Sequence, residues 1–375
     1  MPMQRSRGSW LVLAPLVLFV LVSGCPRQRR FDPGKQTPEE MEQLKATATH
    51  VSPMVRIEGG CFKMGTDSPP PAPPGMDRDR DKLCVKGREG QIECYGVYED
   101  EMPAHEVCLD PYEIDLHEVT FEAFQLCAET LICQPSDLGS DDDFWGPKRP
   151  ATGVVWPAAN AFCEWIGKRL PTEAEWEFAA RGTDGRTYPW GEAKPECGML
   201  AMRLGEEKDA CDRFGTKNVG LYPNDKSPFG LLDMGGNVRE WVSDYYHPGY
   251  YLTLQGVKTS NPTGPERPLQ VLVNTVGDGP DAEAIFLTEQ QRVVRGGTWL
   301  YAEPLTSYRT TNRRGADEMP QLHGELITLG FRCARSLAAP APAPTPTPAA
   351  NGQRPMANGR PLPAPAPAPA PPPTI

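Results

Sequence analysis

The sequence predicts an α+β domain with small sheets, about three helices, long ordered loops and little other regular secondary structure. Apolar residues alternate near residues 55–65 and 105–120, as is typical of half-buried strands. Three short segments carry the signals that begin or end helices. Beyond residue 183 the chain is rich in Gly, Pro and Trp and has few long periodic runs. This composition indicates short strands joined by long loops rather than further helices.

Each expected helix has its own start or stop signal. Thr120 can cap the first helix, and Pro157 is favoured in the first turn of the second. Thr172 and Glu175 form a capping box for the third, because each side chain can satisfy an amide left unpaired at the helix start. Gly182 then supplies the left-handed stop. The expected helical spans, with their caps, are residues 120–129, 157–166 and 172–182.

Length and charge limit the class of protein. The chain has 375 residues, a formal charge of −11 and 39% hydrophobic residues, which fits one sizeable globular domain with accessory segments. Phosphate binding uses a clustered basic face, so this acidic balance argues against a nucleic-acid partner.

The N-terminus predicts export. Arg5 and Arg7 precede an apolar run at residues 10–22, and small residues follow, as in a secretory signal peptide. The stretch Leu21-Val22-Ser23-Gly24-Cys25 resembles a bacterial lipobox. It implies a signal peptide at residues 1–24 and a lipid on Cys25 that attaches the chain to a membrane. An ordinary signal peptide with an incidental cysteine is the alternative.

Residue 26 is Pro rather than Asp. By the sorting rule usual for such lipoproteins, this favours the outer membrane of a Gram-negative bacterium, facing either the periplasm or the cell surface.

Composition divides the rest of the chain. We expect a flexible tether at 25–54, the folded domain at 55–336 and an Ala/Pro-rich disordered tail at 337–375. Two segments, 66–101 and 265–291, interrupt the domain as insertions. The first is so rich in Pro and charge that we expect a surface loop unable to bury a core, pinned by Cys84 and Cys94.

The ten cysteines after Cys25 predict disulfides, because an even number in an exported chain is typical of them. No Cys-x-x-Cys pattern occurs, and His117-Glu118 lacks the second helical histidine of a zinc protease. A zinc site is therefore not expected.

Four blocks of sequence carry a resemblance to a known family over roughly residues 55–336. They are Lys168–Glu177 (KRLPTEAEWE), Gly235–Trp241 (GGNVREW), Arg295–Gly297 and Gly330–Cys333. In this order they resemble the formylglycine-generating-enzyme, or sulfatase-modifying factor, domain. The resemblance implies a C-type-lectin-like fold with a small twisted antiparallel core.

The family's reaction needs two active-site cysteines that hold copper(I). The matching positions here are Tyr301 and Thr306. Copper(I) prefers soft thiolate ligands, which a phenol and a hydroxyl cannot replace. The resemblance therefore implies a domain that kept the fold and lost the oxidase reaction, so copper is not expected. Ala180 and Thr311 likewise stand where some members carry a further disulfide.

The family also implies a disulfide between Cys163 and Cys333, about 170 residues apart. Closing so long a loop stabilises a protein by roughly 4 to 5 kcal/mol in the entropy model. Two buried free thiols are the alternative. Proximity and family topology suggest four further pairs: Cys61–Cys108, Cys84–Cys94, Cys127–Cys133 and Cys197–Cys211.

A calcium site is the cofactor that the resemblance implies. Asp233 and Glu240 would supply carboxylates, and Gly236 and Val238 would supply backbone carbonyls. All are hard oxygen ligands, as calcium requires. The alternative is a turn-stabilising Asp233 beside a buried Glu240 paired with an arginine.

Several residues fall near the ancestral cleft and could form a basic, phenolic pocket for a carboxylate, a sulfate or a glycan. These candidates are Arg239, Trp299, Tyr301, Arg309, Arg313 and Arg314. Most tryptophans match core positions of the family, for which packing is the expected role.

Together these features predict an exported, lipid-anchored protein with a non-catalytic binding or scaffold module. Its ligand would be an unknown protein, peptide or glycan. One alternative is a copper-dependent oxidase that generates formylglycine in sulfatases. Another is a divergent enzyme that uses Tyr301, Arg239 or Glu240 in the same cleft.

Overall fold

The computed structural model describes most of the expected domain. The described residues are 36–50, 53–71, 82–87, 90–136, 143–202, 211, 214–276, 283–300, 305–320, 326–337, 356–357 and 360–361. The predicted signal peptide and the lipidation site Cys25 lie outside them, as do Tyr301 and most of the predicted tail.

Three helices confirm the sequence signals. They are α2 (Phe121–Glu129), α3 (Trp156–Trp165) and α4 (Glu173–Arg181). Thr120 caps α2 by accepting a hydrogen bond from the Ala123 amide, and both halves of the predicted capping box of α4 are formed. Short 3-10 turns lie at η1 (Glu99–Glu101), η2 (Tyr251–Leu254) and η4 (Leu305–Tyr308).

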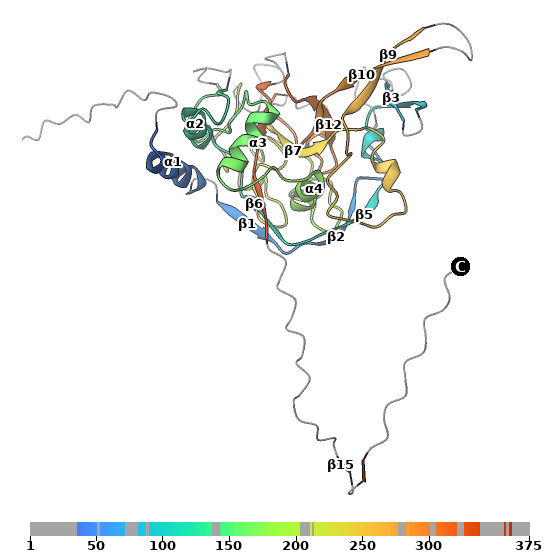
Figure 1. Ribbon diagram of the computed structural model, residues 1–375, viewed down its shortest axis with the longest axis horizontal. Coiled ribbons are helices and arrows are strands. Elements are labelled where there is room, and N and C mark those ends of the chain that lie inside the picture. Colours follow the sequence, from blue (N-terminus) through green and yellow to red (C-terminus); the bar gives the residue numbers. More distant parts are fainter. Residues whose placement is uncertain are drawn as a thin grey trace, which may run out of the picture.

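A fourth helix, α1 (Pro38–His50), corrects the predicted flexible tether at residues 25–54. Thr37 and Glu40 bond each other's backbone amide reciprocally, so α1 begins with a capping box of its own. Ala48 is fully buried against the cluster around α2, and the two helices lie side by side in Figure 1. The segment is therefore docked on the domain over α1.

The central sheet has the order β12–β11–β7–β13. Its strands are Arg313–Asp317, Gln291–Arg295, Arg239–Tyr245 and Leu329–Phe331. β7 pairs with β11 in antiparallel and with β13 in parallel register. Helix α4 packs against β7 and β11 (Figure 1).

Two smaller sheets flank it. The first has the order β1–β6–β14, with strands Met54–Ile57, Tyr112–Asp115 and Ala334–Ser336. The second has the order β2–β5–β8, with strands Gly60–Met64, His105–Leu109 and Thr259–Ser260. Burial alternates along β5 as the sequence predicts. A separate pair, β15 (Met356–Ala357) with β16 (Arg360–Pro361), lies within the Ala/Pro-rich segment.

The two insertions form one further sheet, with the order β10–β9–β3–β4 (upper right in Figure 1). Its strands are Glu283–Glu289, Leu269–Val276, Leu83–Lys86 and Ile92–Tyr95. Val85 of the first insertion pairs with Val271 of the second, and both Val85 and Leu269 are fully buried. The expectation that residues 66–101 cannot bury a core is therefore wrong.

Five disulfides join all ten cysteines between residues 61 and 333. The pairs are Cys61–Cys108, Cys84–Cys94, Cys127–Cys133, Cys163–Cys333 and Cys197–Cys211, and each was predicted. Cys163–Cys333 lies in the core with the aromatic side chains of α2, α3 and β13. Among the described helices, none has the length and apolar character needed to span a membrane.

Candidate functional site

The four sequence blocks meet around β7 and α4, where they form a buried network of charges. Glu240 on β7 accepts hydrogen bonds from Arg332 Nε and Nη2, both at 2.7 Å, and from Trp176 Nε1 at 2.8 Å. All three side chains are almost completely buried. Because a buried charge is costly without a partner, these motifs first serve to hold the core together.

A second buried network joins α4 to β11 and β12. Arg295 donates to Glu173 at 3.1 Å and to Glu177 at 2.6 Å. Arg313 donates to both carboxylate oxygens of Glu173, at 2.7 and 3.0 Å. Burial alone would raise the pKa of Glu173, but the two arginines outweigh it and lower that pKa. Arg313 is thus a structural residue rather than part of an open basic pocket.

The predicted calcium loop lies in a cluster of buried acids. Asp233 Oδ2 accepts a hydrogen bond from the Gly220 amide at 2.5 Å, and burial raises the pKa of Asp233 to about 6. Asp225 accepts from the Gly235 amide at 3.1 and 3.2 Å. Burial, followed by repulsion from Asp233, raises the pKa of Asp225 well above its usual range.

Glu118 completes this acidic cluster. Its side chain is fully buried, and its carboxyl group interacts with that of Asp233, an interaction that lowers the pKa of Asp233. Burial raises the pKa of Glu118 well above its ordinary value, and the charges of Asp233 and Glu240 raise it further. Arg332 is the cation whose charge acts on Glu118, Asp225 and Asp233 alike.

The geometry bears on both interpretations of the calcium loop. The bidentate pair of Arg332 with Glu240 corresponds to the metal-free alternative. The charges of Asp233 and Glu240, which add to burial in raising the pKa of Glu118, would be compensated by a cation or by a proton shared between Glu118 and Asp233.

The end of the first insertion contacts Thr306, where the family resemblance implies a catalytic cysteine. The Thr306 hydroxyl lies 2.8 Å from the hydroxyl of Tyr98, whose backbone is left-handed at φ 64°. Arg309 Nη1 and Nη2 both donate at 2.7 Å to the buried carboxylate of Glu101. Tyr98 and Glu101 therefore contact two of the predicted cleft residues, Thr306 and Arg309.

The other predicted cleft residues lie in different surroundings. Trp299 is buried against the rings of Phe144 and Phe214, which fits the packing role expected of most tryptophans. Arg239 is buried at the start of β7, whereas Arg314 is exposed on β12.

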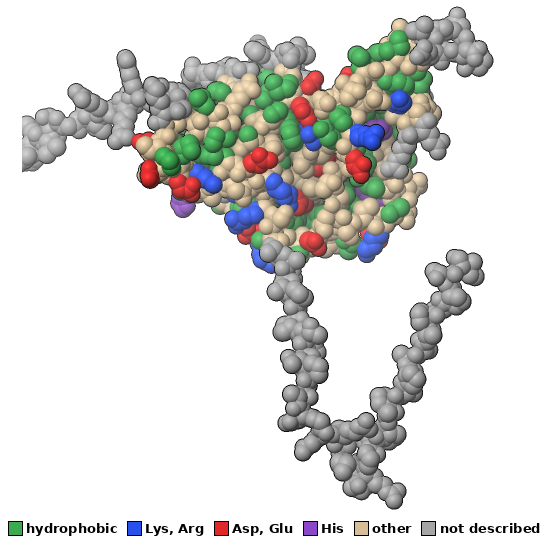
Figure 2. Space-filling model, in the orientation of Figure 1, with side chains coloured by type: hydrophobic (Ala, Val, Ile, Leu, Met, Phe, Trp, Pro, Cys, Tyr) green, Lys and Arg blue, Asp and Glu red, His purple; other side chains and the backbone are tan. Residues whose placement is uncertain are grey.

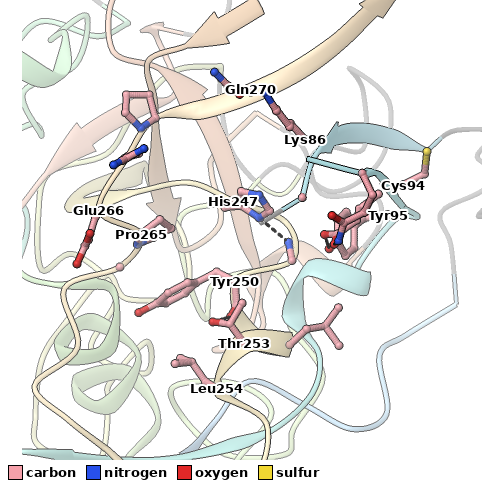
Figure 3. A pocket seen from close by; sticks show the side chains of 18 of the residues that line it. Lys86, Cys94, Tyr95, His247, Tyr250, Thr253, Leu254, Pro265, Glu266 and Gln270 are labelled. Atoms are coloured by element: carbon pink, nitrogen blue, oxygen red, sulfur yellow. Dashed lines mark hydrogen bonds between the residues drawn. The ribbon is translucent and has the colours of Figure 1, made fainter. Parts of the chain in front are cut away.

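A groove of about 1610 Å³ lies instead beside the sheet that the insertions form (Figure 3). One wall is the β3–β4 hairpin, and another is the segment from Gly264 to Gln270. His247, Tyr250 and η2 line it between these walls. The first insertion thus contacts Thr306 through Tyr98 and lines the groove through Tyr95.

No motif in the sequence marks Tyr95, His247 or Tyr250, because the groove exists only where the two insertions meet. Glu118 could have been found. Glu118 lies near the end of the alternating, half-buried stretch at 105–120, and an acidic side chain that is buried there needs a partner.

The fold and this charged core define an α+β protein of the sulfatase-modifying type. Residues 39–337 match the model of the sulfatase-modifying factor enzyme 1-like domain, and the chain belongs to that family. The predicted family and fold class are confirmed. The solved structure of PvdO from Pseudomonas aeruginosa has a TM-score of 0.51 and 25% identity, and the match covers 76% of this chain and 94% of PvdO.

The relatives include both active and inactive proteins. A formylglycine-generating enzyme of Streptomyces coelicolor is 35% identical over 205 residues, which cover 52% of this chain and 56% of the enzyme. The inactive C-alpha-formylglycine-generating enzyme 2 of Mus musculus is 26% identical over 375 residues, covering 88% of this chain and 95% of that protein.

A serine/threonine-protein kinase pkn1 of Chlamydia pneumoniae is 30% identical over 313 residues. The match covers 76% of this chain, but this chain spans only 38% of the kinase.

Proposed function

We propose that this protein is an exported, lipid-anchored binding module that does not generate formylglycine. The support is chemical. All ten cysteines of the domain are in disulfides, so none offers the pair of free thiolates that copper(I) prefers. Thr306, at the position of one family cysteine, instead contacts Tyr98.

A turnover assay tests this proposal. The purified full chain is incubated with copper and a peptide containing Cys-x-Pro-x-Arg, and mass spectrometry follows conversion of the cysteine to formylglycine. We expect no conversion, because no described cysteine carries a free thiol. An active formylglycine-generating enzyme, assayed in parallel, provides the positive control. Conversion by this chain above the copper-only background would make it an oxidase after all.

The same proposal places the protein on a membrane through Cys25. Five disulfides are typical of an extracytoplasmic protein, and the lipobox-like sequence before Cys25 supports a lipid anchor. We expect a Cys25→Ala variant to move from the membrane fraction to the soluble fraction, which immunoblotting measures. A variant that still fractionates with membranes would show that lipidation is not the attachment.

We further propose that calcium binds at the acidic cluster. The donors would be Asp233, Glu240 and the carbonyls of Gly236 and Val238, with Glu118 as an additional acid. All of them are hard oxygen atoms, and a divalent cation would relieve the repulsion that raises the pKa of Glu118. Bound calcium would act on the loop before β7 as a structural ion.

Thermal unfolding with and without a chelator tests the calcium proposal. Saturating calcium should raise the Tm of the full chain by about 4 °C or more, because a ligand of the folded state stabilises it. Glu118→Gln should reduce this rise, while the exposed Glu58→Gln should leave it unchanged. If the chelated protein holds no metal and has the same Tm as the protein in saturating calcium, calcium does not bind here and the acids are protonated instead.

A further inference from the structure

We infer that the groove between the two insertions binds a neutral oligosaccharide. This inference rests on the proposed function as a binding module, and it names the place and the chemical class of the ligand. It depends on the shape of the groove, its balance of charge and the side chains that line it.

The shape suits a chain of several units. At about 1610 Å³ the groove exceeds the roughly 300–1,000 Å³ of pockets that enclose one small molecule. It is neither fully enclosed nor flat, and the β3–β4 hairpin and the segment from Gly264 to Gln270 both line it. An oligomer can therefore lie along it with one edge in solvent.

The charges of the lining balance. Lys86 and Arg267 line the groove together with Glu93 and Glu266, so no field of one sign favours a phosphate or a polyanion. Two of these four charged side chains already contact other residues of the protein. The Tyr95 hydroxyl donates to Glu93 Oε2 at 2.6 Å, and Lys86 Nζ lies 5.5 Å from the centre of the Phe286 ring. This balance favours an uncharged ligand.

The polar lining fits sugar hydroxyls, each of which both donates and accepts hydrogen bonds. His247 Nδ1 accepts from the Gly249 amide at 3.0 Å, so Nε2 carries the proton of the neutral ring. Gln270 adds an amide that donates and accepts, and the exposed Arg267 adds a planar donor.

Two aromatic rings supply flat apolar surface. Figure 3 shows His247 between Tyr95 on one side and Tyr250 on the other. The Tyr95 and His247 rings meet edge-on with centroids 6.4 Å apart, which fixes the position of Tyr95. A sugar ring is apolar on its faces and polar at its rim, so it can stack on a tyrosine while its hydroxyls reach polar side chains.

A peptide fits less well. Strand addition would use β4, the edge of the sheet that lines the groove. β4 has only four residues and carries the charged Glu93, and natural proteins use short, charged edge strands to prevent such pairing.

Isothermal titration calorimetry of the full chain tests this inference, with cellohexaose, hexa-N-acetylchitohexaose, maltohexaose and xylohexaose as probes. At least one hexamer should bind with a Kd below about 1 mM, and its monosaccharide should bind at least about tenfold more weakly. A synthetic peptide of residues 338–375 tests the competing possibility that the Ala/Pro-rich tail of this chain occupies the groove.

Groove variants then locate the binding. Arg267→Ala and Tyr250→Ala should each weaken the affinity about tenfold, while Tyr250→Phe keeps the ring and should retain it. Arg56→Ala is the matched control, because its side chain is 55% exposed on β1, outside the groove.

Three results would overturn the inference: no hexamer binding below about 1 mM, affinity within about twofold of wild type in both alanine variants, or binding of the peptide alone. The turnover assay with the cysteine peptide does not involve these residues, so the non-catalytic proposal is judged separately.

Discussion

Single residues in this domain bury charge to an unusual extent, and buried carboxyls set its response to pH. Burial is the main cause that raises the pKa of Asp100, Asp115 and Asp233 to about 6 and that of Asp244 to about 7. Asp244 Oδ2 accepts from the Glu173 amide and from the Ser243 hydroxyl, both at 2.9 Å. The nearby charge of Glu173 adds to the effect of burial on Asp244.

This environment predicts the effect of replacing Asp244. Between pH 4 and pH 7 the folded protein keeps the Asp244 proton while the unfolded chain loses it, so the stability from this group declines as pH rises. Asn cannot ionise, and its side-chain oxygen can still accept the hydrogen bond from the Glu173 amide. Asp244→Asn should therefore be more stable than wild type at pH 8 by about 1 kcal/mol or more, since each pKa unit corresponds to about 1.4 kcal/mol.

Urea unfolding of both proteins at pH 5, 6, 7 and 8 measures this difference. The gap between variant and wild type should widen as pH rises, because other titrating groups, such as the buried His105 and the half-buried His117, are common to both proteins. Asp317→Asn, at an exposed position of β12, serves as the control. A gap that stays constant with pH would mean that Asp244 is ionised in the folded state throughout.

Elements differ in how much of them the sequence predicts. α2 and α4 begin at local caps, and α3 begins one residue before the Pro157 that predicts it. α1 has an equally local signal in Thr37 and Glu40. The segment around α1 is charged and polar, and this composition led to the prediction of a flexible tether despite the capping signal.

The β9–β10 hairpin is instead an element that depends on distant partners. At its base Leu269 is buried, but Val273, Ile285 and Leu287 are exposed further out, and Figure 2 shows green side chains along it. Only the pairing of β9 with β3 decides which part of this apolar strand meets the core.

At the scale of the whole molecule, Cys163–Cys333 ties α3 to the end of the domain across 170 residues. Replacing both cysteines with alanine should lower the free energy of unfolding by roughly 4 to 5 kcal/mol, because the unfolded chain loses a long closed loop. Cys84→Ala with Cys94→Ala removes a much shorter loop, across a separation of 10 residues, and should cost less. Equal losses in denaturant unfolding would contradict the dependence on loop length.

The sequence by itself determined the family and the caps of α2 and α4, because these depend on residue identity at short spacing or within the four blocks. Proximity and family topology suggested the five disulfide pairs, which the structure contains. Tertiary structure alone decided that Tyr98 reaches Thr306, which is 208 residues away, and that the two insertions pair to form a groove. Contacts between such distant segments depend on the path of the backbone, and no local pattern of side chains records that path.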